Sequence, residues 1–172
     1  KVDLMIFRNT GPVMGYQTYF NNFKNEVVKH GVKTFNSFDG KADMQGKQYL
    51  VDLTRQGYPV IPTIEDISDV HLLCAADQYV LKLKYGADSI GIRRVDEKDL
   101  SGIDMEGNLL QPFIDFTYEV SFYYLNNVFQ YALYAPDKTK RWQLVPYLAT
   151  AADLHFADSF IQWNDMQHGI TR

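Results

Sequence analysis

The chain has 172 residues, of which 46% are hydrophobic and 22% charged, enough for one domain with a real core or for two small lobes that share a cleft. No apolar run approaches the roughly 18 residues of a membrane span. The net charge of −4 argues against a general nucleic-acid or anionic-membrane surface, because both need a cationic field. The single cysteine, Cys74, cannot form an internal disulfide. We therefore expect a cytoplasmic protein that binds neither nucleic acid nor membrane, while a homo-oligomer stays open.

In the first half of the chain, short apolar runs alternate with stretches in which apolar residues recur at helical spacing. The pattern predicts strands over 2–7, 32–36 and 58–63, and helices over 16–30, 47–56 and 68–76. Ser68 is the expected cap of the third helix, with Asp69 in its first turn. Strand, helix, strand, helix, strand favours an open α/β layer.

The second half favours antiparallel strands. After a strand over 109–113, strands over 119–124, 128–134 and 141–145 are joined by an Asn126-Asn127 turn and a Pro136-Asp137 turn, which predicts a meander. A last amphipathic helix is expected over 152–167. Nine aromatic residues crowd positions 113–134. They suit a ligand platform, but on alternating strands aromatics more often pack in the core and across strands, and we favour packing.

The stretch from Tyr79 to Arg94 is expected to form a strand, a polar loop and a second strand. Alternate side chains of a strand share a face, so Lys82 and Lys84 should point the same way. The loop from Tyr85 to Ser89 contains small residues that turn tightly and offer backbone N–H groups to a phosphate. Two interpretations stay open at this point: an anion site, or an exposed hairpin with solvated lysines.

Metal and cysteine chemistry have little support in the pattern. The four histidines are scattered without ligand spacing, and one cysteine cannot make a zinc site. Cys74 lies in the apolar run Val70 to Ala76, where a buried, inert thiol is expected. We therefore predict no metal ligand in this chain.

Four segments occur in an order that resembles the ATP-grasp superfamily, within it the carboxylate–amine ligases of the glutathione synthetase and ribosomal-protein S6 glutamate ligase type. They are Gly46-Lys47 before a helix, Gly57 to Thr63, Val80 to Gly91 with Lys82 at its third position, and Gln111 to Glu119. Each is short, and their joint order covers most of the chain. Leu83 departs from the family pattern, which has proline after the lysine, and Ala87-Asp88 makes the loop more acidic than is common.

The resemblance implies an α+β fold, an α/β sandwich of two lobes with antiparallel sheets, preceded by part of an α/β domain. It divides the chain into a partial preceding segment over 1–42, a first ATP-grasp lobe with its phosphate flap and hinge over 43–113, and a second, truncated lobe over 114–172.

The resemblance also implies ATP as the ligand, held between the two sheets. Lys47 and Lys82 would contact its phosphates, and Ser89 would lie in the flap above them. Gln111, Phe113 and Ile114 would form the hinge that binds adenine, mainly through backbone groups. Glu119 would accept hydrogen bonds from the ribose, although a lone strand carboxylate more often faces solvent.

The two ends of the sequence read as strands without polar tails, so we expect a fragment of a longer protein. The resemblance makes Arg172 the arginine near the reacting phosphate and puts the acidic ligands of Mg²⁺ after it. The protein containing this chain would use ATP and Mg²⁺ to join a small carboxylate to an amine or thiol through an acyl phosphate, and the fragment would be inactive alone. The alternative is a non-catalytic nucleotide-binding or protein-interaction module on the same scaffold.

Overall fold

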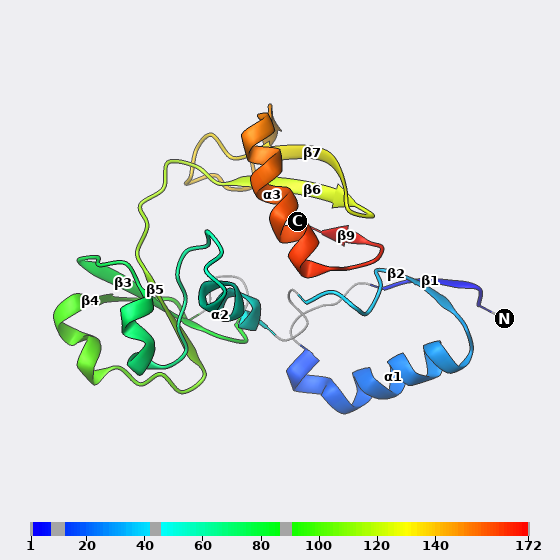
Figure 1. The fold of residues 1–172 in the computed structure, drawn as a ribbon, viewed down its shortest axis with the longest axis horizontal. Helices are drawn as coiled ribbons and strands as arrows, with labels where there is room; N and C mark the ends of the chain where they lie inside the picture. Colours follow the sequence, from blue (N-terminus) through cyan, green and yellow to red (C-terminus); the bar gives the residue numbers. More distant parts are fainter. Residues whose placement is uncertain (1, 8–12, 42–45, 87–90, 172) are drawn as a thin grey trace. The chain divides into compact units, whose positions relative to one another are not determined.

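A computed structural model describes residues 2–7, 13–41, 46–86 and 91–171. The chain divides into two compact units. Figure 1 labels helices and strands of both. Unit 1 combines residues 1–8, 18–41 and 115–172, and unit 2 combines residues 9–17 and 42–114. Unit 1 thus gathers segments from both ends of the chain, whereas the main part of unit 2 is continuous. The predicted division into three consecutive segments stays a prediction.

Unit 1 contains a two-stranded parallel sheet and one long helix beside it. The elements are β1 (Leu4–Ile6), α1 (Gln17–Lys29), whose first residue falls in unit 2, and β2 (Lys33–Phe35). Four phenylalanines pack together, with ring centroids 5.3 to 5.9 Å apart: Phe7, Phe20, Phe23 and Phe38. The helix predicted over 16–30 is confirmed, because Phe20, Phe23 and Val27 recur on one side of it.

The second sheet of unit 1 is antiparallel, in the order β8-β7-β6-β9. Its elements are β6 (Val120–Leu125), β7 (Val128–Tyr134), β8 (Val145–Tyr147) and β9 (Ile170–Thr171), with α3 (Ala151–Asn164) between the last two. Asn126 and Asn127 both have positive φ, at 51° and 63°, and make the predicted turn. Thr150 and Asp153 form a capping box that begins α3.

The aromatics of this sheet pack across strands, as we favoured from the sequence. Tyr123 lies opposite Tyr131 in the register, and their rings stack with centroids 4.7 Å apart. On neighbouring strands, Tyr134 and Tyr147 meet edge to face at 5.8 Å. Such cross-strand pairs stabilise a sheet directly.

Asparagine and serine side chains connect the segment after β2 with the segment before β9. Asn36 donates to the carbonyl of Phe7 (2.9 Å) and accepts from the backbone N–H of Ile170 (2.7 Å). Ser37 donates to the carbonyl of His168 at 2.9 Å. Gly169 has φ 139°, and a Cβ there would lie 2.3 Å from Asn36 Oδ1, so only glycine fits. Two parts of the chain more than 130 residues apart are therefore tied together.

Unit 2 is built on a three-stranded antiparallel sheet in the order β4-β3-β5. Its elements are the 3-10 helix η1 (Val13–Tyr16), α2 (Gln48–Arg55), η2 (Ile67–Leu72), β3 (Gln78–Leu83), β4 (Arg93–Asp96), η3 (Glu97–Gly102) and β5 (Asn108–Pro112). The core cluster on one side of this sheet consists of Ile64, Tyr79, Leu81 and Leu110. Partly buried residues of η2 and η3, among them Ile67 and Leu100, pack against it. The alternation predicted for β3 is confirmed, because Tyr79 and Leu81 are buried together.

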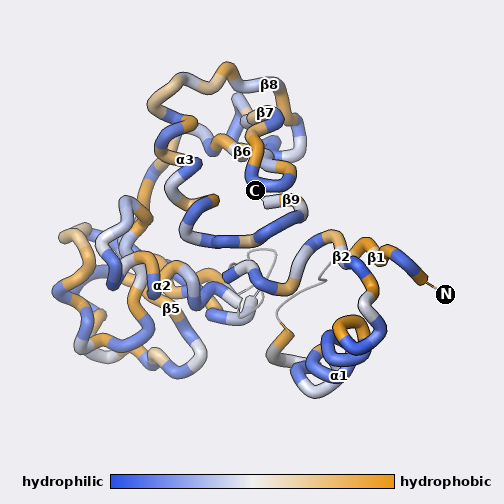
Figure 2. The backbone as a smooth tube through the Cα atoms, turned by 45° about the vertical axis from the view of Figure 1, so that its right-hand side comes forward, coloured by the Kyte–Doolittle hydropathy of each residue, from blue (hydrophilic) through white to orange (hydrophobic). Residues whose placement is uncertain are grey.

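Figure 2 shows that apolar and polar stretches alternate along both units. In the ranges that the structure describes, no helix is both long and apolar enough to cross a membrane.

Two strand predictions are wrong. The run 58–63 makes no strand, and only Ile64 forms an isolated bridge, with Leu110. Pro59 and Pro62 explain the error, because neither has an N–H for a ladder. Without a strand over 58–63, the predicted open α/β layer is wrong as well. The parallel sheet has only two strands among the described residues, and the other two sheets are antiparallel. The strand predicted over 141–145 forms instead at Val145–Tyr147, because turn bonds such as Gln143 N to the Lys140 carbonyl (2.9 Å) occupy the earlier backbone.

The third predicted helix is shorter than expected. It is the six-residue η2, and its cap is Asp66, whose carboxylate accepts from the N–H of Ser68. Cys74 lies beyond its end and is exposed, so the expected burial of this thiol is wrong. The apolar run alone did not show that the helix stops at Leu72.

Candidate functional site

The face of the unit 2 sheet opposite the core cluster carries polar and cationic side chains beside the apolar Val80 and the fully buried Leu109. In the strand register, Val80 of β3 lies between Arg94 of β4 and Gln111 of β5, and Lys82 lies opposite Leu109. Residues directly opposite each other in antiparallel strands share a face. Lys82, Arg94 and Gln111 therefore project from the same side of the sheet.

Lys82 is a partly buried cation without a counter-ion in the described parts of the chain. Its ammonium makes no hydrogen bond or ion pair with any described residue. Burial, and then the positive charge of Lys47, lower the pKa of Lys82 from 10.5 to about 8. Both causes oppose the charged form. A negative charge nearby would relieve both effects.

Lys47 lies at the start of α2, next to the end of β3. Its ammonium donates to the carbonyl of Leu83 (3.2 Å) and to that of Gly86, and its backbone N–H donates to the carbonyl of Lys84 (3.0 Å). Gly46 permits this approach: its φ is 67°, and a Cβ would lie 2.8 Å from the Lys84 carbonyl oxygen. The structure thus brings Lys47 and Lys82 together beside the loop after β3.

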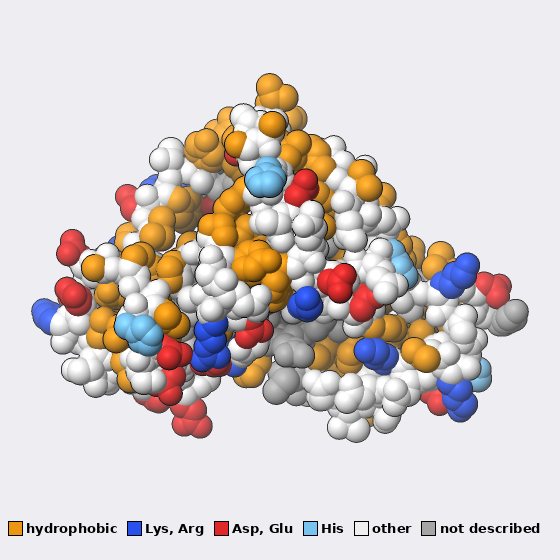
Figure 3. Space-filling model, in the orientation of Figure 1, with side chains coloured by type: hydrophobic (Ala, Val, Ile, Leu, Met, Phe, Trp, Pro, Cys, Tyr) orange, Lys and Arg blue, Asp and Glu red, His pale blue; other side chains and the backbone are white. Residues whose placement is uncertain are grey.

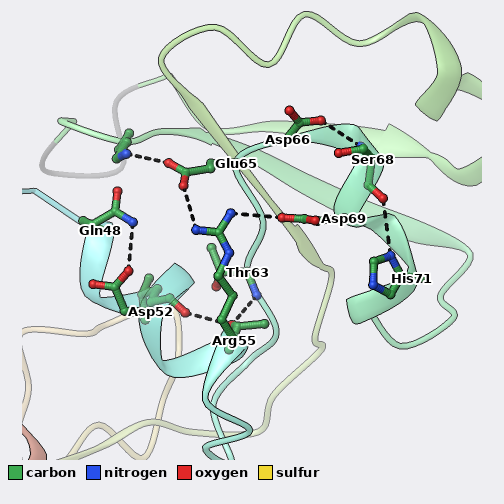
Figure 4. A network of polar contacts seen from close by, with 12 residues as sticks. Gln48, Asp52, Arg55, Thr63, Glu65, Asp66, Ser68, Asp69 and His71 are labelled. Atoms are coloured by element: carbon green, nitrogen blue, oxygen red, sulfur yellow. Dashed lines mark hydrogen bonds and ion pairs between the residues drawn. The ribbon is translucent and has the colours of Figure 1, made fainter.

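Lys84 has a different environment from Lys82. Its ammonium lies 2.6 Å from Glu65 Oε2, and its side chain is only 15% exposed. Arg55 pairs with the same carboxylate at 3.2 Å and with Asp69 at 3.0 Å (Figure 4). The hydrogen bond from Lys84 holds the pKa of Glu65 below its usual range. Lys84 is a structural ion-pair partner, which its strand position alone did not reveal.

Gln111 lies near the end of β5, and the other two residues predicted for the hinge, Phe113 and Ile114, follow the strand directly. Gln111 is buried, and its side-chain amide donates to the hydroxyl of Thr63 at 2.6 Å. The backbone N–H of Phe113 donates to the carbonyl of Gln78 at 2.9 Å, so it is already used within the sheet. Ile114 is exposed. The guanidinium carbon of Arg94 lies 3.9 Å from the centre of the Phe113 ring, a contact that sequence reasoning missed.

The other three predicted site residues are not among the described residues of unit 2. Glu119 belongs to unit 1, just before β6, where it is exposed and pairs with Arg141 at 2.5 Å. Ser89 and Arg172 lie outside the described residues. The roles of all eight candidate residues stay predictions.

Two hollows adjoin β4. One, of about 320 Å³, is lined by Arg94 together with Asp96 and Asp99, and the other, of about 590 Å³, is lined by Arg93 and Asp104 among others. Lys82 lines neither of these two hollows. Figure 3 shows the cationic and anionic side chains of one face of the molecule.

No metal site is assigned. Within residues 2–7, 13–41, 46–86 and 91–171, no three His, Cys, Asp or Glu side chains gather closely enough to hold a metal ion.

The sequence matches no protein-family model and no curated protein. Solved structures resemble it. The D-cycloserine synthetase DcsG superposes with a TM-score of 0.63 at 17% identity, over 99% of this chain and 69% of that one. The ATP-grasp ligase PsnB, complexed with a minimal precursor, gives 0.59 at 15% identity, over 96% and 63%. The chain has the ATP-grasp fold.

A third ATP-grasp neighbour is the D-alanine–D-alanine ligase of Bacillus anthracis, complexed with ATP, with a TM-score of 0.58 at 11% identity over 98% of this chain and 61% of that one. PsnB has also been solved with Mg and ADP. This chain spans 61 to 69% of the length of these three proteins. At such identities the likeness concerns the fold, and the fold agrees with the α+β prediction made from the four ordered segments.

Proposed function

We propose that this chain is the nucleotide-binding part of an ATP-dependent carboxylate–amine or carboxylate–thiol ligase. One observation carries the proposal: Lys82, a partly buried ammonium with no described partner, lies beside Lys47 on the sheet face opposite the core. Two neighbouring cations suit a polyphosphate better than a single carboxylate. The ATP-grasp fold supports ATP as the polyphosphate.

In the proposed reaction, a carboxylate oxygen attacks the γ-phosphorus of ATP, and the bond to ADP breaks. An amine or thiol then attacks the acyl carbon, its proton passes to solvent, and inorganic phosphate leaves as the bond between the acyl carbon and the phosphate oxygen breaks. Lys82 and Lys47 would bind and orient the phosphates and stabilise the charge that develops on them. Ser89 would contact the phosphates from the flap, and Arg172 would lie near the reacting phosphate. Mg²⁺ would neutralise phosphate charge when bound, with ligands that are not assigned to the described residues.

The hinge of Gln111, Phe113 and Ile114 would hold the adenine, and Glu119 would accept from the ribose hydroxyls. One N–H of the Gln111 side-chain amide already donates to Thr63, which fixes the orientation of this side chain. The small carboxylate and the amine or thiol complete the proposed partners.

Lys82→Met tests the proposal. The substitution removes a contact between a partly buried positive charge and a phosphate, so it should weaken ATP binding about 100-fold. This loss is near the upper end of the free energy that a hydrogen bond to a charged group contributes. Isothermal titration calorimetry with ATP measures the change. The matched control is Lys98→Met, because the Lys98 side chain is 77% exposed and lies 4.0 Å from Asp96. Equal ATP affinity in Lys82→Met and wild type would contradict the proposal.

A second candidate is a nucleotide-binding module without ligase activity. It is favoured by the state of Lys47, whose ammonium already donates to the carbonyls of Leu83 and Gly86 and would have to leave them to bind a phosphate. Release of ADP and phosphate by the full protein in the presence of carboxylate and amine separates the two: the module binds ATP without turnover.

A further inference from the structure

Arg94 makes an aromatic contact that reaches across the sheet. It stands on the edge strand β4, and its guanidinium carbon lies 3.9 Å from the ring centre of Phe113, which follows β5. Since β3 lies between these strands, the side chain extends over β3 on the face that carries Lys82. The guanidinium has no hydrogen bond or ion pair with the residues that the structure describes. The planar guanidinium of Arg94 thus packs on the ring of Phe113, and its N–H groups have no partner among the described residues.

The stack lies at a defined distance along the face from the two lysines. Phe113 N–H donates to the Gln78 carbonyl, so Phe113 is level with Gln78, four residues before Lys82. At about 3.3 Å per residue, this separation along β3 is about 13 Å. From Lys82, the face therefore runs over Val80 to the Arg94–Phe113 stack.

A nucleoside triphosphate has the complementary layout, with a polyanion at one end and a flat aromatic base at the other. With its phosphates at Lys47 and Lys82, an extended molecule on this face would carry its base toward Arg94. Guanidinium groups stack on aromatic planes and are weakly hydrated, so they lose little on being covered. We propose that Arg94, supported by Phe113, is the platform on which the base of the bound nucleotide stacks. The inference rests on the proposed nucleotide site.

Stacking distinguishes a nucleotide from a bare polyphosphate but discriminates little between bases, because every base has a π face. The platform therefore contributes to the affinity for both ATP and GTP. A phosphate contact by Arg94 would instead act on any polyphosphate. This difference makes the two roles of an arginine separable by experiment.

Calorimetric titration of the whole chain with ATP, GTP and inorganic tripolyphosphate provides the test. Arg94→Ala should weaken ATP and GTP binding by about 3- to 30-fold, the range of a cation–π contact, and leave tripolyphosphate binding within about twofold. Arg94→Lys should lose most of the same affinity, because an ammonium keeps the charge but not the plane. Arg93→Ala is the matched control, since Arg93 lies opposite Leu81 and so belongs to the other face; it should change neither affinity.

Arg94 is exposed, so its replacement is expected to preserve the fold, which circular dichroism checks. Phe113→Leu gives an independent variant that keeps an apolar support but removes the ring, and it should lower nucleotide affinity without affecting tripolyphosphate. Equal losses for ATP and tripolyphosphate in Arg94→Ala would make Arg94 a phosphate ligand and overturn the platform. Unchanged nucleotide affinity would overturn it as well, while the anion site would stand. Failure of the wild-type chain to bind ATP or tripolyphosphate would reject the proposed function itself, and the platform with it.

Discussion

Lys82 and Lys84 are two residues apart, and the sequence gives both the same face of a strand, yet their environments are opposite. Lys84 is 15% exposed and lies 2.6 Å from Glu65 in a network with Arg55 and Asp69. Lys82 is partly buried, has no partner among the described residues, and has a pKa lowered to about 8. Removing the partner of a partly buried charge destabilises the fold, and a partly buried charge that has no partner is unfavourable until a ligand supplies the opposite charge. The difference separates a structural lysine from a candidate binding lysine.

The largest expected effect of this difference is on stability. Lys84→Met should lower the free energy of unfolding by about 2 kcal/mol, because it leaves Glu65 with a partly exposed Arg55 alone; the value is below the about 3–5 kcal/mol of a fully buried pair, since both groups keep some exposure. Lys82→Met should not destabilise at pH 7, because it removes a desolvated charge. Urea denaturation of both variants measures the changes.

The double variant Glu65→Gln with Lys84→Met isolates the pair. We expect it to be less destabilised than the sum of the two single variants, because the two residues interact directly. Additive losses, or equal destabilisation by Lys82→Met and Lys84→Met, would remove the distinction between the two lysines.

The next effect is a pH dependence of ATP affinity. Lys82 is charged in the free protein below about pH 8, and a bound anion raises its pKa. The affinity for ATP should therefore change little just below pH 8 and fall above it, by up to about tenfold per pH unit. The reason is that above pH 8 the neutral Lys82 must take up a proton when ATP binds. Titration at pH 7.5, 8.5 and 9.5, in buffers of different ionisation enthalpy, measures both the affinity and the proton uptake.

Lys82→Arg is the control for this titration, because arginine stays charged over the whole range and should give a flatter profile. The same lowered pKa has the opposite effect on the free protein: the unfolded chain binds more protons between about pH 8 and 10.5, so stability should rise with pH there. A wild-type ATP affinity that stays constant up to pH 9.5 would mean that Lys82 does not hold the anion.

The smallest effect is expected at the ion pair of unit 1. Glu119 and Arg141 lie 2.5 Å apart, but their side chains are 51% and 61% exposed. Glu119→Gln should change the free energy of unfolding by less than about 0.5 kcal/mol, as is typical of solvated pairs. Thermal and urea unfolding check this value. A loss as large as that of Lys84→Met would show that proximity, not burial, decides which ion pairs matter in this protein.

Local pattern predicted much of the fold. The helical spacing of Phe20, Phe23 and Val27 gave α1, the alternation of Tyr79 and Leu81 gave β3, and two asparagines marked the turn before β7. The run 58–63 failed because apolar content suggested a strand where prolines remove the ladder donors. Each success depended on neighbours within a few residues, and the failure came from backbone donors that composition does not show.

The candidate site was less predictable. The order of short segments indicated Lys47 and Lys82, and the structure places them close together. The contacts of Lys84 with Glu65 and of Arg94 with Phe113 join residues 19 apart in sequence in each case, and they depend on strand register and on the course of a loop. Neither is encoded in local spacing. The sequence identified the candidate lysines, but it did not show which of the cationic side chains already contact another residue of this chain.

The bonds from Asn36 and Ser37 to the segment before β9 have a consequence for the order in which the protein forms during synthesis. The main part of unit 2 ends at residue 114, so its sheet can assemble once that point has left the ribosome. Asn36 must wait for Ile170, and Gly169 must then fit beneath it. Contacts between such distant residues form slowly, because a long loop has to close first. The segment around Asn36 and Ser37 is therefore synthesised early, but it cannot make these hydrogen bonds until residues 168–170 have been synthesised as well.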